Sequence, residues 1–204
     1  MLKLFCRSIR VIKKALTRFS FRYLIPLVKV WYTLTMRFTK ISSMRVGYYH
    51  SFEQIPNDYG WGRRYKKDPL NGKLDYLTHP SKLAHNAAFE LEFGDCDDHA
   101  IFWCTALLKN KLATHAWFCF YSMEKIEDAS TSAHAICVFR GASCGRYYWC
   151  DYNLPTSLGE QPTGWMQESA RGYDAVPLIG AMIKVVWVDP DDTPVFGEIT
   201  ILEP

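Results

Sequence analysis

Apolar residues recur every three or four positions along the first twenty residues of the chain. This stripe consists of Leu2, Phe5, Ile9, Ile12, Leu16 and Phe19, and the Lys and Arg residues lie off it. The spacing predicts a basic amphipathic helix. Pro26 predicts its end, because a residue that precedes proline avoids the helical region of backbone space. The following stretch is apolar but contains Pro26 and Lys29, so a membrane span of about 20 uncharged residues is not expected.

Runs of apolar, aromatic and β-branched residues predict strands later in the chain, at 114–122, 131–139, 145–153, 182–188 and 196–202. The second and third are joined by a short connection, Arg140 to Gly145, which favours an antiparallel hairpin. Helical spacing of apolar residues predicts helices over 81–92 and from Asp95 onward. Turn residues predict loops over 44–80 and 154–171. The expected fold class is therefore α+β, with an antiparallel sheet packed on a helix.

The stretch Gly94-Asp95-Cys96-Asp97-Asp98 runs directly into an apolar helical segment. Asp95 is expected to cap this helix, and Asp98 lies three positions later, as in a capping box. Cys96 then lies at the helix start, where unsatisfied N–H groups and the helix dipole favour a thiolate. The alternative interpretation is that Cys96 is only a small residue at a tight turn.

A cysteine nucleophile needs a base, and the base needs a group that orients it. His134 lies in the middle of a predicted strand among small and apolar residues, where an imidazole needs a polar partner. Asp151 ends the next strand, close enough along a hairpin to hold His134. His115 begins a different strand without such a setting, so His134 is preferred as the base. His99, one turn after Cys96, is a candidate for contact with the thiolate.

Three short stretches together resemble a known family. They are Gly94 to Ala100, Ala133-His134-Ala135 and Trp149-Cys150-Asp151, and they match the nucleophile helix, the His strand and the Asp strand of the transglutaminase-like superfamily. The likeness extends over residues 60–155 and is closest to the bacterial transglutaminase-like cysteine peptidases. It implies a papain-like core with Cys96 as nucleophile, His134 as base and Asp151 as orienting acid.

The resemblance also implies acyl transfer on a protein or peptide amide through a thioester. Peptidase activity is the first expectation, and transglutaminase or deamidase activity on glutamine side chains is the alternative. A peptide-binding module without activity is a further alternative, although it would need none of the three residues. Trp61, Tyr65 and Tyr76 are candidates for the lining of a substrate cleft.

No cofactor is required for this chemistry, but some members of the family bind calcium through acidic residues beside the cysteine. Asp95 and Asp97 occupy the matching positions, so a calcium site is one interpretation of them. In the other interpretation Asp95 caps the helix and Asp97 faces solvent. Zinc is not expected, since the seven cysteines form no paired CxxC elements.

Charge divides the chain into two parts. Residues 1–45 hold eleven Lys and Arg and no acidic residue, whereas the rest has 24 − 11 = 13 basic and 21 acidic residues. We therefore expect a basic helical arm over 1–45 and a catalytic domain over 46–204. The arm is expected to pack on its own acidic domain, or to bind a membrane surface or a partner protein. Nucleic acid is not expected, because no binding motif accompanies the charge.

The odd number of cysteines predicts free thiols in a reducing compartment. The apolar segment near the N-terminus lacks the features of a signal peptide. The sequence thus favours a cytoplasmic protein, peripheral at a membrane if the arm binds lipid.

Overall fold

A computed structural model describes residues 2–41, 43–59, 77–89, 91–152 and 154–204, and within the first helix the side chains of Arg18 and of residues 22 onward. The helices are α1 (Leu2–Thr39), α2 (Gln54–Tyr59), α4 (Pro80–Ala88), α5 (Cys96–Lys109) and α6 (Trp165–Arg171). The strands are β1 (Ala113–Lys125), β2 (Thr131–Gly141), β3 (Tyr147–Cys150), β4 (Thr156–Gly159), β5 (Ala175–Val188) and β6 (Pro194–Leu202). All five strands expected from the sequence are present, with shifted ends.

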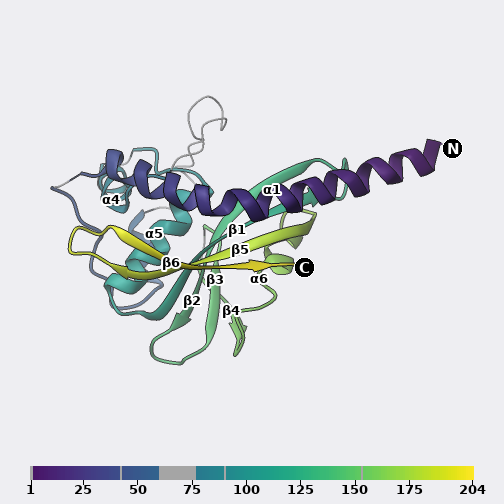
Figure 1. The fold of residues 1–204 in the computed structure, drawn as a ribbon. Helices are drawn as coiled ribbons and strands as arrows, with labels where there is room; N and C mark the ends of the chain where they lie inside the picture. Colours follow the sequence, from purple (N-terminus) through teal and green to yellow (C-terminus); the bar gives the residue numbers. More distant parts are fainter. Residues whose placement is uncertain (1, 42, 60–76, 90, 153) are drawn as a thin grey trace.

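The six strands form one antiparallel sheet in the order β4-β3-β2-β1-β5-β6 (Figure 1). Strands β1 to β4 follow one another as a meander, and β5 returns to pair with the other edge of β1. The expected hairpin is confirmed, since β2 and β3 pair with Cys137 opposite Cys150. The α+β class is therefore confirmed.

Side chains alternate between the two faces of the sheet, and each face has its own core. On one face α5 packs on β1 and β2, with Phe118 and Phe139 among the buried residues. On the other face the short helix α6 packs against Tyr121, Ile136 and Val138. The fully buried Trp103 of α5 and Trp165 of α6 are the largest side chains of the two layers.

Helix α1 does not end before Pro26, as the sequence predicted, but continues to Thr39. Pro26 itself is exposed, so water can solvate the backbone carbonyl that the missing N–H leaves without a partner. Residues beyond it bury one face against the domain: Ile25 is 2% exposed and Met36 0%. Packing of this second half therefore outweighs the cost of the proline.

The segment 154–171, predicted as a loop, contains β4 and α6. Both elements are short, and α6 begins after Gly164, whose φ of 88° is left-handed. Seven residues are too few for a helical period to be recognised in the sequence. The prediction was wrong here, and α6 supplies groups to the candidate site described below.

Among the helices that the structure describes, none is long and apolar enough to cross a membrane.

Candidate active site

Cys96 is the first residue of α5, and the chain turns sharply just before it. A Cβ on Gly94 would lie 2.5 Å from the Cβ of Asp98, so only glycine allows this close approach. The Asp98 carboxylate accepts hydrogen bonds from the backbone N–H of Thr78 (2.7 Å) and from its hydroxyl (3.1 Å). Asp98 thus holds the start of α5 against the segment that precedes α4.

The expected capping box is not formed. Asp95 occupies the N-cap position with extended backbone, but its side chain makes no capping hydrogen bond. Asp98, the other member of the expected pair, is turned toward Thr78 instead. The helix start is therefore defined by the Gly94 turn and the Thr78 contact, which local sequence spacing does not reveal.

His134 and Asp151 lie in direct contact, as the sequence predicted. Nε2 of His134 lies 2.8 Å from Oδ1 of Asp151, and both side chains are largely buried. Since the carboxylate can only accept, this nitrogen carries the proton that binds Asp151. In the neutral imidazole the lone pair is then on Nδ1, which is the nitrogen available to take a proton from a thiol.

Two hydroxyl groups donate to the Asp151 carboxylate and a third binds one of these two, and sequence reasoning missed all three. Tyr173 donates to Oδ2 of Asp151 at 3.1 Å, and its oxygen also lies 3.1 Å from Nε2 of His134. Ser169 of α6 donates to the same Oδ2 at 3.4 Å, and Tyr121 of β1 lies 2.8 Å from the Ser169 hydroxyl. Burial and the Asp151 charge raise the pKa of Tyr173, so its hydroxyl stays protonated and can donate.

Cys96 shares neighbours with His134. Its charge contributes to raising the pKa of Tyr121 and of Tyr173, although burial is the larger cause in both. The rings of these two tyrosines pack against His134, with centroids 6.0 and 4.8 Å from the imidazole. The half-buried Cys96 is therefore near enough to Tyr121 and Tyr173 for its charge to act on them.

His99 of α5 reaches this cluster through Tyr152. The Tyr152 ring lies 4.8 Å from the ring of His99 and 5.7 Å from that of His134. Burial lowers the pKa of His99 to about 3, so its ring is neutral at physiological pH. This neutral, buried ring packs on Phe93 and Tyr152. His115, by contrast, is half-buried and stacks on Trp117, and it lies six residues before Tyr121 along β1.

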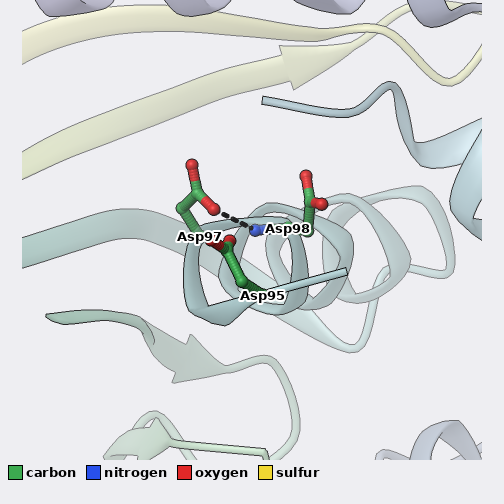
Figure 2. A group of neighbouring side chains, drawn as sticks. All are labelled: Asp95, Asp97 and Asp98. Carbon is green, nitrogen blue, oxygen red and sulfur yellow. Dashed lines mark hydrogen bonds between the residues drawn. The ribbon is translucent and has the colours of Figure 1, made fainter. Parts of the chain in front are cut away.

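Asp95, Asp97 and Asp98 gather beside Cys96 (Figure 2), with carboxylate oxygens within 4.8 Å of one another. Asp97 does not face solvent, as one interpretation of the sequence held, but is 4% exposed. Its Oδ1 accepts from the backbone N–H of Asp98 at 2.9 Å. Among the described residues, Oδ1 of Asp95 and Oδ2 of Asp97 are buried and accept no hydrogen bond.

Burial and the neighbouring acids Asp95 and Asp98 raise the pKa of Asp97 well above its usual value. Such a group either keeps its proton near neutral pH or is neutralised by a cation. Carboxylate oxygens are the ligands that hard divalent cations prefer.

Three other cysteines are deeply buried between α5 and the sheet. Sγ of Cys104 lies 3.4 Å from Sγ of Cys137, and Cys150 donates to the carbonyl of Cys137 at 3.7 Å. Burial is the main cause that raises the pKa of all three, so they remain thiols at neutral pH. The six cysteines whose side chains the structure describes are free.

Two hollows of about 700 and 450 Å³ lie at another part of the surface. Lys109 and Asp192 line the larger one, and His79 and Thr193 line the smaller. Neither hollow is lined by Cys96, His134 or Asp151. Trp61, Tyr65 and Tyr76, the expected cleft residues, lie outside the described residues.

A scan against models of known protein families finds no match to this chain, and a search of curated proteins finds no similar sequence.

Proposed function

We propose that the protein is a cysteine-dependent enzyme of acyl transfer, with a transglutaminase-like, papain-like core and a protein or peptide amide as its substrate. The observation that carries the proposal is the His134–Asp151 pair, at 2.8 Å, in a chain that also has a cysteine at the start of a buried helix. The resemblance of the three motifs to bacterial transglutaminase-like cysteine peptidases supports it independently of this geometry. Cys96, His134 and Asp151 are the proposed catalytic residues.

In the proposed mechanism, His134 takes the proton of the Cys96 thiol on Nδ1. Asp151 accepts from Nε2 and so holds the imidazole in the required tautomer and stabilises the imidazolium. The thiolate attacks the amide carbonyl, and the backbone N–H at the start of α5 stabilises the oxyanion. The amine leaves with the proton from His134, and a thioester remains on Cys96.

The acceptor of the acyl group decides the reaction class. Water gives a peptidase or a deamidase, whereas an amine gives a transglutaminase. We propose peptide hydrolysis first, because the motif resemblance is closest to peptidases. A fluorogenic peptide library separates peptide hydrolysis from the others, and release of ammonia with or without amine incorporation separates deamidation from transamidation.

Calcium is the proposed ligand of the acidic group, although the acyl-transfer steps do not require it. Asp95 and Asp97 would supply the oxygens that accept no hydrogen bond from described residues. A bound divalent cation would place positive charge beside Cys96 and favour its thiolate form. Asp98 would contribute through its position, since both of its oxygens already accept from Thr78.

The first prediction concerns the reactivity of Cys96. We expect iodoacetamide to label Cys96 selectively at a pH well below the free-thiol pKa of about 8.5, and His134→Ala to abolish this selectivity. Labelling of each cysteine is followed by mass spectrometry between about pH 4 and 9. Cys144, exposed on the β2–β3 connection, is the internal comparison: its hydrogen bond with Tyr148 lowers its pKa, so Cys96 must be labelled faster than a thiol that is itself accessible and partly activated.

Activity on the peptide library is then compared between the wild type and Cys96→Ser. Complete loss of turnover with an unchanged thermal unfolding curve supports a covalent mechanism. Labelling of Cys96 no faster than Cys144, together with turnover that survives Cys96→Ser, would falsify the proposal. Selective labelling without turnover on any amide would instead favour a peptide-binding module that has kept the reactive residues.

A further inference from the structure

The outward surface of helix α1 is apolar over most of the length that the structure describes. Seven large hydrophobic residues lie there exposed: Tyr23, Leu24, Leu27, Val30, Trp31, Leu34 and Phe38. Leu27 is 63% exposed and Phe38 85%, whereas Ile25 and Met36 on the opposite side are buried against the domain. The helix is thus apolar on two faces, of which the domain covers only one.

This outer face continues the apolar stripe recognised in the sequence. Leu2 and Phe38 are 36 residues apart, which is ten turns at 3.6 residues per turn, so both positions lie on the same side of an unbroken helix. The intervening apolar positions, Phe5, Ile9, Ile12, Leu16, Phe19, Tyr23, Leu27, Val30 and Leu34, follow at steps of three or four. Because α1 continues through Pro26, the apolar positions before and after the proline lie along one helix over a length of about 54 Å.

Charge accompanies the stripe. Among the Lys and Arg of residues 1–45 whose side chains the structure describes, five contact the domain. Arg18 and Lys29 donate to the carbonyls of Leu178 and Gly197, Arg22 pairs with Glu203, and Lys40 and Arg45 pair with Asp191. Five more lie in the first four turns, which Figure 1 shows running past the sheet toward the N-terminus.

From this we infer that the outer face of α1 lies on an anionic lipid bilayer, with the helix parallel to the membrane plane. An apolar stripe backed by Lys and Arg matches the acyl boundary and the charged headgroups of such a surface. Trp31 and Tyr23 are residue types that prefer the membrane–water interface. A second copy of the chain is a poorer occupant, because the five Lys and Arg of the first four turns have no acidic neighbour on the arm and would repel those of the second copy.

The inference does not depend on the proposed acyl transfer, and its test uses the full chain. Sedimentation with vesicles of phosphatidylcholine alone is compared with vesicles of equal parts phosphatidylcholine and phosphatidylglycerol. We expect pelleting with the anionic vesicles only, and a marked loss when NaCl rises from about 0.05 to 0.5 M. Cys96→Ser is expected to bind like the wild type, which separates this proposal from the catalytic one.

The decisive variant is Leu27→Gln/Leu34→Gln/Phe38→Gln, which keeps good helix formers on α1. We expect its partition onto anionic vesicles to fall by at least about tenfold. A matched triple variant elsewhere on the surface, Phe89→Gln/Leu91→Gln/Ile126→Gln, removes exposed apolar residues outside α1 and is expected to bind normally. Circular dichroism establishes that both variants remain folded.

Three results would overturn the inference. One is equal binding of the wild type and the α1 variant. Another is absence of pelleting on either vesicle at low salt. The third is a concentration-dependent dimer, seen by sedimentation velocity without lipid, that the α1 variant dissociates, since this would identify a second copy as the occupant.

Discussion

At the scale of single residues, the most informative side chain is Asp97. A carboxylate beside two other acids, in a region rich in charged residues, reads from the sequence as a solvated group. The structure buries it, with one oxygen bound to the N–H of Asp98 and the other without a donor among the described residues. Burial raises the pKa of Asp97. The ionised Asp97 therefore lowers the free energy of unfolding, by an amount that depends on pH and on bound cations.

This leads to a prediction for Asp97→Asn. The unfolded carboxyl loses its proton near pH 4, while the folded one resists, so Asp97 destabilises the fold progressively as the pH rises above 4. Asn keeps an oxygen for the Asp98 N–H and carries no charge. With a chelator present, we expect the variant to be more stable than the wild type by about 1–2 kcal/mol at pH 7, and equal to it near pH 4.

Urea unfolding at several pH values, with and without calcium, measures this difference. Calcium should stabilise the wild type and leave Asp97→Asn unchanged, because a ligand that binds only the folded state adds to its stability. Equal calcium effects on both proteins would contradict the metal assignment. A variant that is less stable than the wild type at pH 7 without calcium would contradict the burial argument.

At the scale of secondary-structure elements, the sequence predicts contacts between neighbouring elements and misses contacts between residues that are distant along the chain. His134 and Asp151 lie on neighbouring strands of one hairpin, so alternation and turn signals were enough to pair them. Ser169 and Tyr173 lie in α6 and in the turn after it. No hydrophobic periodicity in that segment predicts a contact with Asp151. Similarly, Pro26 marked a helix end by its local preference, but burial of Ile25 and Met36 kept the helix intact.

Tyr173→Phe tests the contribution that the α6 region makes to the proposed site. The change removes the hydroxyl that contacts both Asp151 and His134, and it leaves the ring in place. A hydrogen bond to a charged group is worth about 1.5–3 kcal/mol, so we expect alkylation of Cys96 below pH 7 to slow by about tenfold or more. The pH profile of alkylation should shift, while the unfolding midpoint changes little.

Tyr48→Phe is the matched control, since Tyr48 is 84% exposed and lies away from the site. An unchanged rate and pH profile for Tyr173→Phe would mean that the Asp151–His134 pair needs no support from α6.

At the scale of the whole molecule, the second half of α1 belongs to the same packed body as the sheet. Tyr32 packs edge-to-face on Phe118 of β1, and Thr35 exchanges hydrogen bonds with the backbone of Leu77. Lys29 and Arg22 tie the helix to β6 and to the residue just after it. The boundary at residue 45 that the charge distribution predicts therefore does not coincide with a break in packing.

Met36→Ala and Phe38→Ala measure this directly, since the two residues lie two positions apart on the same helix and have opposite exposure. Met36 is fully buried, and its truncation is expected to cost about 2–4 kcal/mol. Phe38 is exposed, and its truncation should change the free energy of unfolding by about 0.5 kcal/mol or less. Urea denaturation of both variants measures whether the second half of α1 contributes to the stability of the core. Similar small effects would show that α1 is an appendage and not part of the core.

The contact between α1 and β6 has a consequence in time. Lys29 and Gly197 are 168 residues apart, so the ribosome needs about 10–30 s to supply the strand that the helix binds. During that interval the inner face of α1 lacks the complete sheet that covers it, while its outer face is apolar from Tyr23 to Phe38. A lipid surface met in those seconds would hold the nascent helix before the rest of the domain exists, and folding would then proceed at the membrane.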